Sequence, residues 1–338
     1  MASNITLADV AKAAGVSTST VSRIINDKPD VSSATRKHVM KVIGELGYSP
    51  HLQAQGLAAG KSRTIAILYP TENMEFSHLE IDFLIGVSNA MAEAGYLFNF
   101  LTDFLSESQL LNLYRSGQID GTILMQVHTE DWRVNSLRQH CYPFVMIGHA
   151  ADNTGISFVD LDFATAVVRC FEHLVNLGHE QIGFINFPVA MIENGYGPAV
   201  RLFEGYHRAC DLFHLRPAYC EADLSLQDVF QATSKLLDEH PELTAIIGVH
   251  NALIASVIRS LQERSLSIPG DFSVVGMLTD KIARLMTPPL TAVNIPTFDM
   301  GYQASKMLID VLRNRASPIQ QVLLEPNLIV RESTAVHR

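Results

Sequence analysis

Short apolar stretches alternate with longer amphipathic ones from residue 63 to the end of the chain. The apolar stretches predict β-strands at 64–70, 97–101, 120–126, 143–148, 181–188, 245–249 and 272–277. Apolar residues at helical spacing predict helices at 78–96, 162–179, 199–213 and 252–266, with one more running through Tyr114. A short crossover is expected between 148 and 162. This alternation predicts an α/β fold with parallel sheets covered by helices on both faces.

The first 48 residues have a different pattern, which predicts three short helices. Thr6 and Asp9 form a cap signal at the start of the first helix, and Gly15 marks its end. Ser17 caps the second helix, whose inward face carries apolar side chains. The outward face is polar without an acidic residue, and it comprises Thr18, Ser19, Ser22, Arg23 and Asn26.

Two short helices joined by a tight turn are typical of a helix-turn-helix. The second helix would enter the major groove, which is about 12 Å wide, with its N-terminal side chains at the base edges. Arg23 has the fork geometry for guanine, and Ser17 at the helix N-terminus suits a phosphate. The alternative is a three-helix bundle with a solvated polar face.

The run TLADVAKAAGVSTSTVSRIINDKPDVSSATRKHVMKVIGELGYSP resembles the head of the lactose-repressor/galactose-repressor (LacI/GalR) family of bacterial regulators. The resemblance implies that Thr18, Ser19 and Arg23 read bases. It also implies backbone contacts from Ser22, Asn26 and Tyr48. Thr6 and Ser17, at two helix starts, complete the predicted set of DNA-contacting residues in the head.

Residues 49–62 form a weak helical segment, in which Gly56 lowers helix stability by roughly 0.5–1 kcal/mol relative to Ala. In the resembling family this segment is the hinge helix, and a leucine from each of two hinges wedges a base step in the minor groove. Leu57 falls on that position. The alternative is an ordinary flexible linker with an apolar contact at Leu57.

The resemblance extends through the body in phrases such as HLVNLGHEQIGFI, EGYHRA, IPGDFSVVGM and IVREST. It implies two lobes like those of periplasmic sugar-binding proteins, joined by three crossovers near 159–164, 290–296 and 322–328. The expected domains are a helix-turn-helix head (1–48), a hinge (49–62) and an effector-binding and dimerisation body (63–338). The N-lobe would comprise about 63–161 and 293–323, and the C-lobe about 162–292 and 324–338.

Ligands of open α/β sheets lie at the carboxyl ends of strands, so loops after strands supply the candidate effector-binding residues. These are Thr71, Glu72, Phe76, Gln126, His128, His149, Asn194, Arg201, His250, Asn251, Thr279 and Asp280. Phe76 matches a family aromatic that stacks on ligand rings, and Asn251 matches an asparagine that bonds ligand hydroxyls.

Several positions depart from the sugar-binding members of the family. Gly148 and Leu278 stand where those members place aspartates, and Ala252 follows Asn251 where they have Asn-Asp. The family's arginine would fall on Leu202, one residue after Arg201. Carboxylates are good hydroxyl acceptors, so their loss weakens the case for a hexose. A sugar or sugar derivative stays the first choice because it is the family's commonest ligand, and a nucleoside or small acid is the alternative.

The net charge of −10 hides an asymmetry. Residues 1–62 carry seven Lys/Arg and four Asp/Glu, a net charge of +3, whereas the remainder carries 18 basic and 31 acidic residues. Only the head is therefore expected to meet phosphates.

Four scattered cysteines, no membrane-length apolar run and no signal peptide at the start predict a reduced cytoplasmic protein without a membrane partner.

The sequence thus predicts a ligand-responsive regulator, with repression as the expected role, although the sign of the ligand's effect stays open. A homodimer on near-palindromic double-stranded operator DNA is expected, because one helix reads only a few base pairs and the chain ends without a heptad tail. No cofactor, metal or catalytic residue is expected, since no nucleophile elbow, P-loop or metal spacing occurs. The rival classes are an α/β enzyme and a solute-binding protein.

Overall fold

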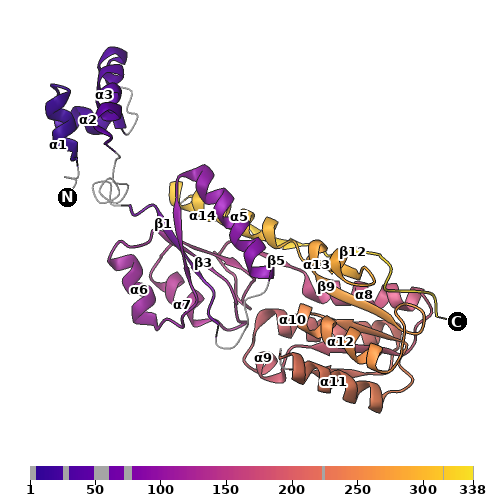
Figure 1. The fold of residues 1–338 in the computed structure, drawn as a ribbon. Helices are drawn as coiled ribbons and strands as arrows, with labels where there is room; N and C mark the ends of the chain where they lie inside the picture. Colours follow the sequence, from indigo (N-terminus) through magenta and orange to yellow (C-terminus); the bar gives the residue numbers. More distant parts are fainter. Residues whose placement is uncertain are drawn as a thin grey trace. The chain divides into compact units, whose positions relative to one another are not determined.

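The computed structural model describes residues 5–25, 30–48, 61–71, 78–222, 225–314 and 316–337 (Figure 1). The chain divides into two compact units, residues 1–63 and 64–338. The first unit contains the residues of the head and of the hinge, and the second is the body. Each is described by itself.

The head contains three helices: α1 (Leu7–Ala13), α2 (Thr18–Ile25) and α3 (Ser33–Leu46). A reciprocal capping box between Thr6 and Asp9 starts α1, and the Ser32 side chain caps α3. The helices pack around an apolar core whose fully buried members include Val10, Val21 and Val39. The predicted order of three short helices is confirmed.

The first sheet of the body has the strand order β11-β5-β4-β3-β1-β2 and is parallel throughout. Its strands are β1 (Thr64–Leu68), β2 (Leu97–Leu101), β3 (Gly121–Leu124), β4 (Phe144–Ile147), β5 (Phe158–Leu161) and β11 (Gln321–Leu324). One apolar core includes side chains of α5 (His78–Ala94) and α14 (Thr297–Arg313). The other includes side chains of α6 (Glu107–Arg115) and α7 (Trp132–Gln139), so helices cover both faces.

The second sheet has the order β12-β10-β9-β8-β6-β7. Its strands are β6 (Ile182–Asn186), β7 (Tyr219–Glu221), β8 (Ala245–Gly248), β9 (Ser273–Leu278), β10 (Thr291–Asn294) and β12 (Asn327–Ile329). The β10–β12 pair is antiparallel, which departs from the predicted all-parallel arrangement. The helices associated with this sheet are α8 (Phe163–Asn176), α9 (Val189–Glu193), α10 (Gly197–Phe213), α11 (Leu226–Glu239), α12 (Asn251–Glu263) and α13 (Asp280–Leu285).

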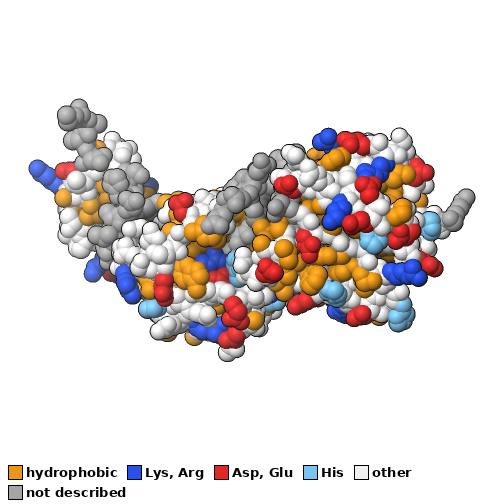
Figure 2. Space-filling model, turned by 90° about the horizontal axis from the view of Figure 1, so that it is seen from below, with side chains coloured by type: hydrophobic (Ala, Val, Ile, Leu, Met, Phe, Trp, Pro, Cys, Tyr) orange, Lys and Arg blue, Asp and Glu red, His pale blue; other side chains and the backbone are white. Residues whose placement is uncertain are grey.

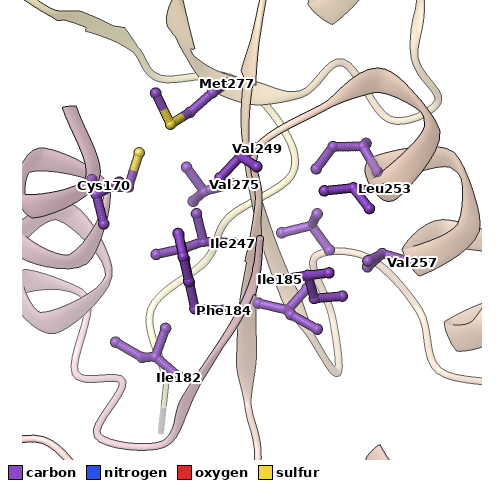
Figure 3. Close-up of a cluster of buried hydrophobic side chains, with 14 of the residues drawn as sticks. Cys170, Ile182, Phe184, Ile185, Ile247, Val249, Leu253, Val257, Val275 and Met277 are labelled. Atoms are coloured by element: carbon purple, nitrogen blue, oxygen red, sulfur yellow. The ribbon is translucent and has the colours of Figure 1, made fainter. Parts of the chain in front are cut away.

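Alternation along the strands explains how this second sheet carries a core on both faces. Figure 3 shows Phe184 pointing toward the side of Cys170, on α8, while its neighbour Ile185 points toward Leu253 and Val257, on α12. Successive side chains of a strand face opposite sides, so a strand that is buried on both faces is apolar throughout. All five residues of β6 are buried, four of them apolar or glycine.

The chain passes between the two sheets three times: after β5, after β10, and between β11 and β12. Strand β5 lies where the sequence predicted only a short crossover, so that expectation was wrong. Its four residues, Phe158–Leu161, are too few to give a periodic signal beside the stronger helix that follows. The α/β class with a separate three-helix head is confirmed.

Two further observations concern the distribution of side chains on the surface of the body and the length of the helices. Figure 2 shows acidic, basic and hydrophobic side chains interspersed over the face of the body that it presents. Within the described parts of the chain, no helix has both the length and the apolar character needed to cross a bilayer.

Candidate functional site

The outward face of α2 presents the polar side chains that the sequence singled out. Thr18, Ser19 and Arg23 are exposed, and Ser22 is half-buried. The Ser17 hydroxyl accepts a hydrogen bond from the Thr20 amide at 3.1 Å, so it caps α2 as predicted. Apolar contacts on the opposite face hold α2 against the core of the head, so this row of side chains faces outward.

Arg23 has an acidic neighbour. Its Nη1 lies 3.3 Å from Oδ2 of Asp30, and both side chains are more than half exposed. An exposed ion pair of this kind contributes about 0–1 kcal/mol, so it can be exchanged for another acceptor at little expense. Arg23 is therefore available to a base or phosphate once Asp30 releases it.

The other predicted contacts in the head and hinge differ in their surroundings. The Thr6 hydroxyl is engaged with Asp9 in the α1 cap, at 2.7 Å from Oδ2. Tyr48 is half-buried and packs against the apolar core of the head. Asn26 and Leu57 lie outside the described residues. The DNA contacts of all these residues stay predictions.

A cavity of about 120 Å³, here called the interlobe cavity, lies between the two sheets of the body. Residues at or just beyond the carboxyl ends of β1, β3, β4, β6 and β8 line it, as the strand-end rule predicts. Its walls are largely apolar: Tyr69, Phe83, Met125, Val127, Ile147, Gly148, Phe163, Phe187, Tyr196, Pro198, Leu202, Val249, Ile295 and Met300. The polar groups are Gln126, Asp160 and His250.

Two of the predicted effector residues, Gln126 and His250, line this cavity. Asn251 follows His250 at the start of α12, and its buried Oδ1 has no hydrogen-bond partner among the described residues. An unpaired buried acceptor is unfavourable unless a ligand or water supplies a donor. Asn251 therefore retains the properties expected of a ligand contact, although it does not line the cavity.

The remaining predicted effector residues lie elsewhere. His128 borders a different cavity, and burial lowers its pKa. Asn194 caps the end of α9, and the Thr71 amide bonds to the Thr102 carbonyl. Glu72 and Phe76 lie outside the described residues.

Asp280 is committed to an ion-pair network rather than to the interlobe cavity. Its Oδ1 lies 2.5 Å from Nη2 of Arg331, and its Oδ2 lies 2.8 Å from Nη2 of Arg284. Thr279, the residue before it, is buried, and its hydroxyl has no partner among the described residues. Arg331 comes from the C-terminal segment, 51 residues further on, so sequence alone could not indicate this pairing.

Asp160 is the residue that the sequence analysis missed. It lies in β5, is 1% exposed and contributes a carboxylate to the interlobe cavity. Its Oδ2 is 2.7 Å from Nδ1 of His149 and 3.8 Å from Nη1 of Arg201. A lone aspartate within the apolar stretch SFVDL was the available signal, because such a carboxylate is seldom buried without a partner.

The two lobes are hydrogen-bonded to each other beside this cavity. The Thr129 amide donates to the Gly195 carbonyl at 2.7 Å, and the Gly197 amide donates to the Val127 carbonyl at 3.0 Å. We call this pairing the interlobe bridge. Arg201 reinforces it, since its Nη2 donates to the His149 carbonyl at 2.5 Å. Burial lowers the pKa of Arg201, while the nearby Asp160 opposes that shift.

Glycines make this close approach possible. A Cβ at Gly195 would stand 2.6 Å from Oγ1 of Thr129, and a Cβ at Gly197 would stand 2.8 Å from the Val127 carbonyl oxygen. Both distances are too short for a real side chain. The two glycines of the GYGP stretch, residues 195–198, thus allow the contact between the lobes.

Comparisons with known proteins agree with this architecture. Residues 6–51 match the model for bacterial regulatory proteins of the lacI family, and residues 171–334 match a periplasmic binding protein-like domain. The HTH-type transcriptional regulator CelR of Thermobifida fusca is 30% identical over 97% of this chain and 98% of its own length. The chain belongs to the lacI family.

Other lacI-family proteins align over nearly the whole chain. Catabolite control protein A of Priestia megaterium is 29% identical over 98% of this chain and 99% of its own length. The lac repressor dimer, solved with operator and the anti-inducer ONPF, superposes with a TM-score of 0.83 at 25% identity, covering 98% of this chain and 99% of its own. The predicted family, its DNA-binding head and its role in transcription regulation are confirmed at this level.

Proposed function

We propose that this lacI-family regulator binds a near-palindromic operator as a homodimer and represses transcription under the control of a small molecule in the interlobe cavity. The observation that carries the proposal is the cavity itself. It is walled by both lobes, and each lobe contributes polar groups: Gln126 and Asp160 from one, His250 from the other. A ligand there has different contacts in open and closed lobe arrangements, and only such a difference can shift an equilibrium.

The walls indicate the kind of ligand. The interlobe cavity has a volume of about 120 Å³. Its polar groups are few, and aromatic rings such as Tyr69, Phe187 and Tyr196 dominate. We favour a single-ring sugar derivative that carries an apolar or planar group. The aromatic walls specifically favour a nucleoside as the second candidate, because a base can stack there.

The relatives support a small hydroxylated ligand. A complex of the regulator CelR with cellobiose has a TM-score of 0.70 to this chain at 27% identity, covering 97% of this chain and 99% of its own. The lac repressor has been solved with ONPG. These ligands belong to those proteins, and they come to this chain only as a class of compound to test.

The dimer is supported by apolar surface on the N-lobe. Ile81 and Ile85 lie one turn apart on α5 and are both more than 40% exposed. Phe298 is also exposed, on α14, which packs directly against α5. Apolar side chains gathered on adjacent helices are typical of a protein–protein contact. Analytical ultracentrifugation of the full chain should therefore report a dimer.

Operator binding with and without ligand tests the proposal. A duplex is first selected from random DNA, and candidate ligands are found by thermal shift, because a ligand that binds the folded state stabilises it. The selected ligand should change operator affinity about 5–150-fold, equivalent to a coupling of roughly 1–3 kcal/mol. Repression predicts that transcription from a promoter containing the duplex falls when the protein is added.

A pair of matched variants assigns the effect to the cavity. Asp160→Asn removes the buried carboxylate that lines the cavity and should abolish the ligand response while ligand-free operator binding persists. Asp310→Asn makes the same exchange on the exposed surface of α14 and should respond like the unmodified protein. An unaltered response in Asp160→Asn would place the ligand outside the interlobe cavity.

A further inference from the structure

A second cavity, of about 220 Å³, lies on the N-lobe and has no lining residue in common with the interlobe cavity. We call it the outer cavity. It is formed at the carboxyl ends of β1 and β2, by α6, and by the loop that leads from β3 into α7.

Two large aromatic side chains stand at the outer cavity and remain exposed. Trp132, the first residue of α7, is 45% exposed, and Phe104, in the β2–α6 loop, is 58% exposed. Exposed aromatic rings beside a cavity offer flat apolar faces on which the C–H face of a ring-shaped ligand can stack. Neither ring has an aromatic neighbour among the described residues.

Hydrogen-bonding groups of both kinds accompany these rings. Asp103 and Glu130 are exposed lining residues, and in the described part of the chain no hydrogen bond or ion pair engages either carboxylate. Arg133, also a lining residue, has a side chain that is only 8% exposed. The site thus offers two free acceptors at its rim, beside the two exposed rings.

The guanidinium of Arg133 is only partly satisfied. Its Nε and Nη2 bond to the two carboxylate oxygens of Asp131, at 2.9 and 2.6 Å, and Nη2 also donates to the carbonyls of Met125 and Gln126. Nη1, at the opposite corner of the fork, is buried and has no partner within the described residues. A buried donor left unpaired is costly, but this atom is closed to a water-sized neighbour, so a ligand in the outer cavity reaches it only if the surrounding groups move.

We propose that the outer cavity is a second small-molecule site, and that it takes a neutral, polyhydroxylated ring. Hydroxyl groups donate to Asp103 and Glu130, and the ring stacks on Trp132. An anion is disfavoured, because Asp131 neutralises Arg133 and the two rim carboxylates remain negative. A simple organic cation would also suit the carboxylates and the aromatic rings, so it is the contrast that the titration below includes.

Tryptophan fluorescence can report on ligand binding at this site. Trp132 is the only tryptophan in the sequence, so all tryptophan emission of the full chain reports on the outer cavity. We would titrate the protein with myo-inositol, D-glucose and D-ribose as neutral polyols, and with tetramethylammonium chloride and inorganic phosphate as contrasts. At least one polyol should shift the emission of Trp132 saturably, and the two ions should not.

Three variants locate the response. Glu130→Gln should weaken the affinity for that polyol about tenfold, because a hydrogen bond to a charged group contributes roughly 1.5–3 kcal/mol. Glu107→Gln, an exposed carboxylate of α6 outside the cavity, should leave the affinity unchanged. Asp160→Asn alters the interlobe cavity alone and should also retain the response. His250→Ala repeats that comparison from the other lobe if Asp160→Asn does not fold.

Four results would overturn the second site. In the titration, these are the absence of a saturable response to any of the three polyols, and a response only to tetramethylammonium or phosphate. Among the variants, they are equal affinities of Glu130→Gln and the unmodified protein, and loss of the response in Asp160→Asn or His250→Ala. The last result would assign the polyol to the interlobe cavity instead. Failure of the effector proposal is separate, since operator binding measures it without Trp132.

Discussion

Gly197→Ala is the substitution for which the structure makes the most demanding prediction. Gly197 opens α10, where alanine is the better helix former, so backbone conformation does not oppose the change. The atoms around Gly197 do oppose the substitution, because they leave no room for a Cβ. The new Cβ would stand 2.8 Å from the Val127 carbonyl oxygen and would clash with Nη1 of Arg201. The first of these atoms is backbone of the opposite lobe and cannot move without opening the interlobe bridge.

The magnitude follows from two opposing effects. Overpacking of this kind destabilises by about 1–3 kcal/mol, and loss of the 3.0 Å hydrogen bond from the Gly197 amide contributes about 0.5–1.5 kcal/mol within that range. The gain in helix propensity offsets up to about 1 kcal/mol. We expect the free energy of unfolding of the body to fall by about 1–2 kcal/mol, together with a more open arrangement of the lobes.

Denaturant titration of the full chain measures the first quantity, and the radius of gyration from small-angle scattering measures the second. Gly44→Ala is the matched control, because Gly44 lies in α3 with no atom within 4 Å of its added Cβ. That variant should be as stable as the parent or more so. A Gly197→Ala protein with unchanged stability and unchanged lobe arrangement would refute the claim that the glycine is required for the interlobe bridge.

Further predictions concern the head, the interlobe cavity and the C-terminal segment. Arg23→Ala should reduce discrimination at one base pair per half-site by about 1–3 kcal/mol, measured by competition between operator variants. Asp30→Asn frees Arg23 from an exposed ion pair and should raise operator affinity by at most about fivefold, in the same assay. Asn251→Ala should remove the ligand response without changing ligand-free operator binding, and a variant that responds normally would exclude Asn251 from ligand contact. His179 lies just after α8, is buried, and its Nε2 is 3.2 Å from the carbonyl oxygen of Ala335 in the C-terminal segment. Burial lowers the pKa of its imidazole below the ordinary 6.5, so the neutral form stabilises the fold at higher pH and this contribution is lost as pH falls. His179→Gln should therefore flatten the loss of thermal stability between pH 7 and pH 5.

The parts of this protein that sequence predicted well depend on short-range patterns. The polar face of α2 is visible because Thr18, Ser19 and Arg23 recur at helical spacing, and the apolar strands of the body punctuate its helices. Gln126 and His250 were found by the rule that ligands lie at strand ends. Each of these inferences needs only residues close together in the chain.

The parts that sequence did not predict depend on partners far away in the chain. Asp280 pairs with Arg331, which lies 51 residues further along the chain, and its contact with a ligand stays a prediction. Asp160 looked unremarkable until His149 and Arg201 were seen around it. A buried charge takes its role from the groups that satisfy it, and only the folded chain shows which groups those are.

The pairing of β11 with β5 has a consequence for how the protein is made. Gln321 pairs with Phe158, so the edge strand of the N-lobe sheet arrives only after strands β6 to β10 of the other lobe have been translated. Helix α14, which packs against α5, arrives equally late. On the ribosome the C-lobe strands β6 to β10 emerge as one continuous run. The N-lobe, which is synthesised earlier, lacks α14 and β11 during that time, so part of its apolar core stays uncovered. Nascent chains arrested just before residue 297 should therefore engage chaperones through the portion synthesised first.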